Sequence, residues 1–118
     1  MKLIRSFGHA WHGIQHCFAT QLNFRIHLFI LLLVVITGFF LKITNTEWLF
    51  IVVCSMLVLA LEMINTAIEQ MCDSVTKNIH PAIRMIKDVS AGAVLVGAAG
   101  SAVTGFIIFL PRILHLVK

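Results

Sequence analysis

Three long stretches of uncharged, mostly apolar residues constrain this chain more than any other feature. They run from Leu28 to Leu41, from Trp48 to Leu61 and from Val89 to Leu110. A helix needs about 20 apolar residues to cross a bilayer, so the third stretch suffices alone and the first two must extend at their ends. The chain is 59% hydrophobic and 12% charged, whereas soluble domains are about 45–50% apolar and about 25% charged. The sequence therefore predicts an integral membrane protein with three transmembrane helices.

The N-terminal segment has a different pattern, because its apolar and basic side chains segregate to opposite sides of a helix. Such a helix lies in the membrane interface or packs on the protein's own core, and both interpretations stay open. We expect a single all-α domain over residues 1–118. It comprises an amphipathic surface helix over 1–26 and transmembrane helices over about 27–43, 47–72 and 88–110. Three such helices make a thin bundle, so we also expect a closed homo-oligomer.

The distribution of Lys and Arg predicts the orientation. With the N-terminus in the cytoplasm, six basic residues lie inside and three outside, which obeys the positive-inside rule. The six are Lys2, Arg5, Arg25, Lys77, Arg84 and Lys87, and the three are Lys42, Arg112 and Lys118. The net charge of +4 suits anionic lipid headgroups, and no Lys/Arg-rich run with interleaved aromatic residues indicates a nucleic-acid partner.

A stripe of polar residues follows the second apolar stretch. Glu62, Asn65, Thr66, Glu69 and Asp73 fall within an arc of about 100° on a helix. Ionisable groups at membrane depth are costly, so they usually face a bundle interior or a wet cavity and carry function. The alternative is a cytosolic helix end whose acids are solvated, but Glu62 lies close to the apolar stretch.

These residue types form a set suited to metal-assisted phosphoryl transfer. Glu69, with Asp88 or Asp73, offers hard oxygen ligands for Mg²⁺ on the phosphates of ATP. Lys87 can neutralise phosphate charge, and Glu62 can take the proton from a lipid hydroxyl. The sequence has no glycine-rich phosphate loop, so side chains and metal must hold the phosphates.

Two other classes of protein use similar residues. A transporter or proton relay also needs intramembrane acids, but it is expected to show inverted repeats or broken helices, and none is evident in the sequence. A non-catalytic scaffold, packed through small residues, has no need for a set of acids with a lysine.

The pattern resembles the signature of a known family. Its central part is Glu62-x-x-Asn65-Thr66-Ala67-Ile68-Glu69-x-x-x-Asp73, followed by His80, Lys87-Asp88 and Ala91-Gly92-Ala93-Val94-Leu95. Further matches are Gly8-x-x-Trp11-x-Gly13, Asn23-Phe24-Arg25-Ile26-His27 and Phe109-Leu110-Pro111. Together they look like the prokaryotic diacylglycerol kinases, which are small integral-membrane lipid kinases. The resemblance implies a homotrimer in the bacterial inner membrane, with its sites between neighbouring subunits at the cytoplasmic face.

The resemblance also implies roles for individual residues. By this likeness, Glu62 is the catalytic base, Asn65 orients the reacting groups, and Glu69 binds the Mg²⁺ that carries ATP. Lys87 and Asp88 hold the phosphates. The loop Asn78-Ile79-His80 lies where the family contacts nucleotide.

The same resemblance shows one position where this chain departs from the family pattern, and it suggests a substrate. The family usually has a second metal-binding glutamate where this chain has Gln21, and the loss of a charge predicts a raised Mg²⁺ requirement. The segment ending in His27 and the pair His80-Pro81 resemble the branch that phosphorylates undecaprenol. The alternative substrate is diacylglycerol, whose kinases usually carry a glutamate where His27 stands.

Overall fold

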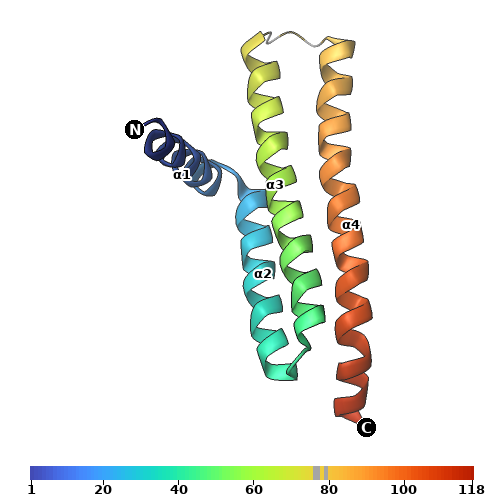
Figure 1. Ribbon diagram of the computed structural model, residues 1–118. Coiled ribbons are helices and arrows are strands. Elements are labelled where there is room, and N and C mark those ends of the chain that lie inside the picture. The colour runs from blue at the N-terminus through green and yellow to red at the C-terminus, as the bar shows by residue number, and fades with distance from the viewer. Residues whose placement is uncertain (76–77, 79) are drawn as a thin grey trace.

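The computed structural model describes residues 1–75, 78 and 80–118, which form four α-helices (Figure 1). These helices are α1 (Lys2–Thr20), α2 (Leu22–Leu41), α3 (Asn45–Val75) and α4 (Pro81–Val117). Helices α2, α3 and α4 run alongside one another, and α3 packs most extensively against α4 (Figure 1). Helix α1 leaves the bundle at a steep angle where α2 begins. The predicted all-α architecture, with an N-terminal helix and three helices long and apolar enough to cross a membrane, is confirmed.

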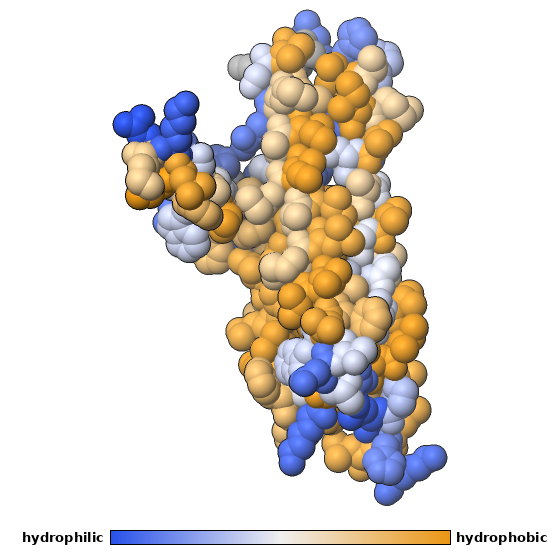
Figure 2. All heavy atoms as spheres, in the orientation of Figure 1, coloured by the Kyte–Doolittle hydropathy of each residue, from blue (hydrophilic) through white to orange (hydrophobic). Residues whose placement is uncertain are grey.

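The surface of the bundle is apolar along most of its length. Large side chains such as Phe29, Phe40, Val96 and Phe106 are exposed in the single chain. Figure 2 shows hydrophobic residues covering the middle of the bundle, with hydrophilic residues gathered at its two ends and on α1. Lipid is the only solvent that accepts so much apolar area, so the chain is a multi-pass membrane protein.

The break between α1 and α2 comes earlier than expected. The helix predicted over 1–26 ends at Thr20, because Gln21 adopts an extended conformation with φ −111° and ψ 109°. Hydrophobic periodicity continues on both sides of Gln21, so the sequence pattern does not reveal the break. The break turns the chain from α1 into the first membrane span.

Helix α1 keeps its apolar face largely uncovered. Leu3, Phe7 and Trp11 on this face are more than half exposed, and Cys17 is the only residue of α1 that is buried. Contacts with the rest of the protein therefore bury α1 only at Cys17. The rest of the face suits the headgroup–acyl boundary of a bilayer.

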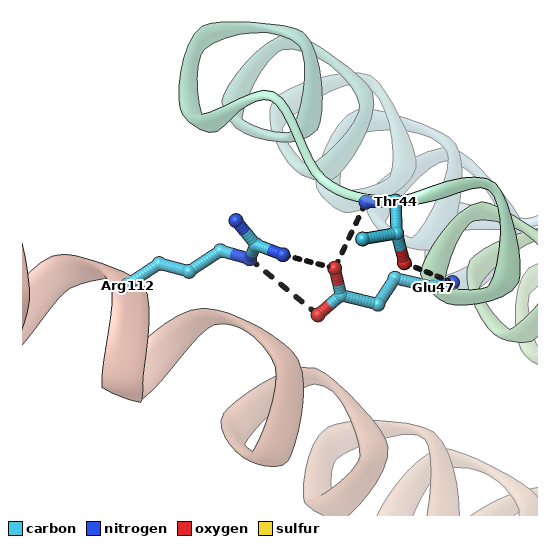
Figure 3. A network of polar contacts seen from close by, with 3 residues as sticks. All are labelled: Thr44, Glu47 and Arg112. Carbon is cyan, nitrogen blue, oxygen red and sulfur yellow. Dashed lines mark hydrogen bonds and ion pairs between the residues drawn. The ribbon is translucent and has the colours of Figure 1, made fainter.

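A hydrogen-bonded turn joins α2 to α3 at the end of the bundle remote from α1. Lys42 ends α2 in the left-handed conformation, with φ 54°, and its amide donates to the carbonyls of the last turn. Thr44 and Glu47 then form a capping box, with the Thr44 amide 2.9 Å from Glu47 Oε1 and the Glu47 amide 3.2 Å from Thr44 Oγ1. The Arg112 guanidinium of α4 donates to the same carboxylate (Figure 3). This network ties both neighbouring helices to the start of α3.

Helix α4 differs from the sequence prediction at its C-terminal end. The expected span ended at residue 110, before Pro111, whereas α4 continues through Pro111 to Val117. A proline removes one backbone hydrogen bond, but the next residue, Arg112, is held by Glu47 of α3. At the other end, Pro81 occupies the first turn of α4, where its missing N–H costs nothing.

Small residues recur every four positions on α4 at Gly97, Ser101 and Gly105, and they have two environments. A Cβ atom at Gly97 would lie 2.7 Å from Leu61 Cδ1, and Ser101 Oγ donates to the Cys54 carbonyl at 3.4 Å. These two positions therefore bring α4 close to α3. Gly105 continues the series, but a Cβ there would meet no atom within 4 Å.

Candidate active site

The polar stripe of α3 is buried at its centre. Glu62 is 4% exposed, Asn65 9% and Thr66 4%, whereas Glu69 and Asp73 approach the open end of the bundle. The Thr66 hydroxyl donates to the Glu62 carbonyl at 3.0 Å, so it is satisfied within its own helix. Asn65 Nδ2 donates to Glu69 Oε1 at 3.2 Å. The helix thus presents the predicted catalytic and metal-binding side chains along one face.

Two neighbouring helices close over Glu62. His27 of α2 places Nε2 3.7 Å from Glu62 Oε1. From α1, the thiol of Cys17 is buried near Thr66 and the Glu62 carboxylate. Burial raises the pKa of the Cys17 thiol, and the negative charge of Glu62 adds to this effect. Glu62 is therefore a largely dehydrated carboxylate inside a small polar enclosure.

The open end of the stripe carries a cation. Lys87 Nζ of α4 lies 2.6 Å from Asp73 Oδ1 and is close enough to be attracted by the Glu69 carboxylate. Both side chains of the Lys87–Asp73 pair are well exposed, so a competing anion can reach the ammonium. The structure therefore brings Lys87 to the acids of α3, as the sequence pattern suggested.

Of the other residues predicted to bind nucleotide, Asp88 and His80 make no hydrogen bond with the acids of α3 in the described part of the chain. Asp88 follows Lys87 on α4, but its carboxylate makes no hydrogen bond or ion pair with another residue in the ranges that the structure describes. His80 caps α4 by accepting a hydrogen bond from the Ala82 amide at 3.2 Å through Nδ1. Asn78 lies in the connection between α3 and α4. Ile79 falls outside the described residues.

The position expected to hold a second metal-binding glutamate lies at the α1–α2 junction. Gln21 Nε2 donates to Thr20 Oγ1 at 3.2 Å, and no hydrogen bond joins Gln21 to Glu69 among the residues described. A different contact links α1 to α3, because Gln70 Nε2 lies 2.8 Å from His16 Nε2. His16 therefore fastens α1 at the residue that follows Glu69.

One buried oxygen in the site has no partner. Asn65 Oδ1 accepts no hydrogen bond from any described residue, although an orphaned buried oxygen is costly. An unpaired oxygen beside the Glu69 carboxylate suits Mg²⁺, which takes one or two protein oxygens and fills its shell with water and phosphate. No cluster of three His, Cys, Asp or Glu side chains gathers in the part of the chain described here. The residues therefore fit a metal that arrives with the phosphates of a nucleotide.

An apolar groove begins next to this site. It has a volume of about 540 Å³ and lies between α2, α3 and α4, with His27 among its lining residues. His27 belongs to the segment that carries the family resemblance, but the sequence pattern does not predict its contact with Glu62. The available signal was a lone polar residue at the same membrane depth as Glu62. A buried carboxylate at the head of an apolar groove can act on a polar group carried by a lipid.

Comparison with known proteins agrees with this arrangement. Residues 8–109 match the Prokaryotic diacylglycerol kinase family. The chain is 38% identical to an undecaprenol kinase of Bacillus subtilis, over 95% of this chain and 91% of that protein. It is 37% identical to a diacylglycerol kinase of Synechocystis, over 98% of this chain and 67% of that protein. It is 25% identical to a diacylglycerol kinase of Escherichia coli K12, over 87% of this chain and 84% of that protein. The chain therefore belongs to the prokaryotic diacylglycerol kinase family and is a membrane-embedded lipid kinase.

Proposed function

We propose that this lipid kinase transfers the γ-phosphoryl group of ATP to undecaprenol, with Mg²⁺, at the cytoplasmic leaflet of the bacterial inner membrane. The observation that carries the proposal is the position of Glu62. It is buried at 4% exposure beside the head of an apolar groove, while Lys87 and Glu69 lie further toward the aqueous end. A lipid hydroxyl and a nucleotide can therefore approach the same site from opposite directions.

Each side chain has a distinct task in this reaction. Glu62 accepts the proton of the lipid hydroxyl as its oxygen attacks the γ-phosphorus. The new O–P bond forms, the bond to the β-phosphate oxygen breaks, and the nucleoside diphosphate leaves. Lys87 exchanges its exposed partner Asp73 for phosphate oxygens of the nucleotide. Asp88, on the same helix turn, helps to hold the phosphates.

Glu69 and the unpaired Asn65 Oδ1 hold Mg²⁺, with Gln21 offering an uncharged oxygen. When bound, the ion neutralises charge on the β- and γ-phosphates. Asn65 also orients the Glu69 carboxylate through its amide N–H at 3.2 Å. In this proposal Asn78, Ile79 and His80 supply the remaining contacts with the nucleotide, as the family resemblance implies.

Assembly completes the site in this proposal. Most of the bundle surface is apolar, and one chain encloses Glu62 but leaves Lys87 and Asp73 open. A homotrimer with the N-terminus in the cytoplasm lets a neighbouring subunit cover the open side. Diacylglycerol is the second candidate substrate, because the relative from Synechocystis is a diacylglycerol kinase of nearly equal identity, 37% against 38%.

The test is phosphorylation of defined lipids by the purified protein. The protein is incubated with γ-labelled ATP, Mg²⁺ and micelles that contain undecaprenol, diacylglycerol or no added alcohol, and the extracted lipids are separated. Label in undecaprenyl phosphate, at a kcat/KM above that for diacylglycerol, supports the proposal. Preferential labelling of diacylglycerol assigns the second candidate. Absence of label in any lipid alcohol refutes the kinase reaction.

A further inference from the structure

A second group of charged side chains lies at the end of the bundle remote from the candidate active site. Figure 2 shows hydrophilic residues gathered at this end. A cleft of about 510 Å³ lies here between the end of α2, the start of α3 and the C-terminal turns of α4. Four of the side chains that line it are titratable, namely those of Lys42, Glu47, Arg112 and His115. We refer to it as the distal cleft, and the proposed kinase reaction makes no use of it.

The distal cleft carries more positive than negative charge. Lys42 and Arg112 are permanent cations, and Glu47 is the only acid among the described residues that line the cleft. Arg112 binds Glu47 through Nε and one terminal nitrogen, and its third nitrogen points away from the carboxylate (Figure 3). The exposed Lys42 ammonium makes no ion pair with any residue that the structure describes. One net positive charge therefore remains for an anion, and His115 adds another when it is protonated.

The distal cleft lies at the level of a membrane interface. Glu47 and Glu62 are separated by about 22 Å along the axis of α3. The hydrocarbon core of a bilayer is about 30 Å thick, so these two residues lie near its opposite boundaries. The turn between α2 and α3 adjoins the cleft, and its backbone groups need the water that the interface supplies. The cleft therefore opens at the headgroup layer of the leaflet remote from the candidate active site.

Apolar side chains line the part of the cleft nearer to the hydrocarbon. Phe40 precedes Lys42 on α2 and Ile107 precedes Arg112 on α4, and both helices run toward this end, so the two apolar residues lie deeper. Phe40 is 73% exposed and Ile107 is 70% exposed. A free phosphate ion gains nothing from such walls. A phospholipid suits both parts of the cleft, because its phosphate lies at the interface and its acyl chains extend into the hydrocarbon.

We propose that the distal cleft binds an anionic phospholipid of the leaflet remote from the candidate active site. Lys42 and Arg112 hold its phosphodiester group, and its acyl chains lie on the apolar wall that includes Phe40 and Ile107. This lipid is distinct from the alcohol that is phosphorylated, which meets Glu62 about 22 Å away. Basic pockets between transmembrane helices bind anionic headgroups, and each Lys or Arg near the membrane surface contributes about fivefold to the affinity.

Trp48 can report on the occupant of the distal cleft. It packs on the hydrophobic cluster of Ile43, Ile51 and Ile108, and Ile108 also lines the cleft. The chain has two tryptophans, so Trp11→Phe leaves Trp48 as the single fluorescent reporter. Brominated acyl chains quench a tryptophan that they contact. Quenching of Trp48 in phosphatidylcholine bilayers therefore measures how strongly an added bromolipid binds beside it.

The first experiment compares two bromolipids and two matched variants, all in the Trp11→Phe background. We expect brominated phosphatidylglycerol to bind beside Trp48 about fivefold more tightly than brominated phosphatidylcholine, because the cleft has one net positive charge. Lys42→Gln should abolish this preference. Lys118→Gln removes the same charge at the same end of the bundle, but from a residue outside the lining, so it should leave the preference unchanged.

A second variant should shift the preference in the opposite direction. Glu47→Gln removes the carboxylate but keeps an oxygen that can accept the hydrogen bond of the Thr44 amide. The cleft gains one net positive charge, so the preference for phosphatidylglycerol should rise about fivefold. A lower preference in Glu47→Gln than in its parent would contradict the charge argument and overturn the inference.

Three other results would also overturn the inference. Equal quenching by the two bromolipids would show that no anionic lipid is held beside Trp48, as when a neighbouring subunit fills the cleft. Equal loss of preference in Lys42→Gln and Lys118→Gln would mean that only the general surface charge acts. Loss of the preference on adding inorganic phosphate, with chloride as the control for ionic strength, would mean that the cleft takes a phosphate ion. ATP and the lipid alcohol are left out, so these results are independent of the kinase reaction.

Discussion

The network around Glu47 predicts a stability effect that can be worked out from its contacts. Glu47 accepts the Thr44 amide at 2.9 Å and also binds the Arg112 guanidinium (Figure 3). The capping contact is worth about 1 kcal/mol. The ion pair is worth about 1 kcal/mol at most, because its side chains are still 31% and 23% exposed and solvent weakens their attraction. Glu47→Ala should therefore lower the free energy of unfolding by about 2 kcal/mol.

A double-mutant cycle separates the two contributions. Arg112→Gln removes the ion pair and keeps the capping box, so it should cost about 1 kcal/mol, or about half the loss in Glu47→Ala. Reversible unfolding in mixed micelles, followed by the helical circular dichroism signal, measures each variant and the double variant. The coupling energy between Glu47 and Arg112 should be about 1 kcal/mol.

Activity provides the control for the same variants. The network lies at the end of the bundle opposite the candidate active site, so kinase activity per folded molecule should not change. A coupling energy of zero would show that Arg112 does not bind Glu47 in the folded protein. Loss of activity without loss of stability would show that this end of the bundle takes part in the reaction.

Three further predictions concern other parts of the molecule. Gly38→Ala should destabilise the protein by about 1–3 kcal/mol relative to Gly100→Ala in the same unfolding assay. The reason is that a Cβ at Gly38 would lie 2.6 Å from the Trp48 ring, whereas a Cβ at Gly100 has open space. Equal effects of the two substitutions would mean that the turn after α2 adjusts freely. Cys17 should react slowly with maleimide, because it is buried. Its reaction rate should still rise at a pH where an exposed thiol is fully ionised, because burial raises the pKa of the Cys17 thiol. A rate that matches that of a free thiol would show that α1 is not docked on the bundle. Gln21→Glu should lower the Mg²⁺ concentration for half-maximal activity about tenfold, since it adds an anionic ligand. An unchanged Mg²⁺ titration of activity would show that residue 21 does not bind the metal.

The sequence determines much of this fold because membrane insertion depends on composition and length. The three apolar stretches were sufficient to predict three helices long enough to cross a membrane. The polar stripe beginning at Glu62 was sufficient to predict where a polar site lies on the second of them. Both features lie within single helices, where a fixed angle per residue relates spacing to direction.

Features that depend on contact between helices could not be predicted in the same way. The approach of His27 to Glu62 and the burial of Cys17 arise from how α1 and α2 pack on α3. The break at Gln21 is a single extended residue inside a continuous periodic pattern. Helix α4 passes through Pro111, while Arg112 reaches Glu47 on another helix. Periodicity describes which face a residue occupies, but not the partner that the face meets.

The most direct test of the central claim separates nucleotide binding from transfer at Glu62. Glu62→Gln keeps the shape of the side chain but removes the base, so Mg²⁺–ATP affinity, measured by calorimetry, should stay within about twofold of the unmodified protein. Single-turnover transfer of phosphate to undecaprenol by the same protein should fall by about 10²–10⁴-fold. Transfer at the unmodified rate, or loss of ATP binding in step with transfer, would contradict a role for Glu62 as the base that takes the lipid proton.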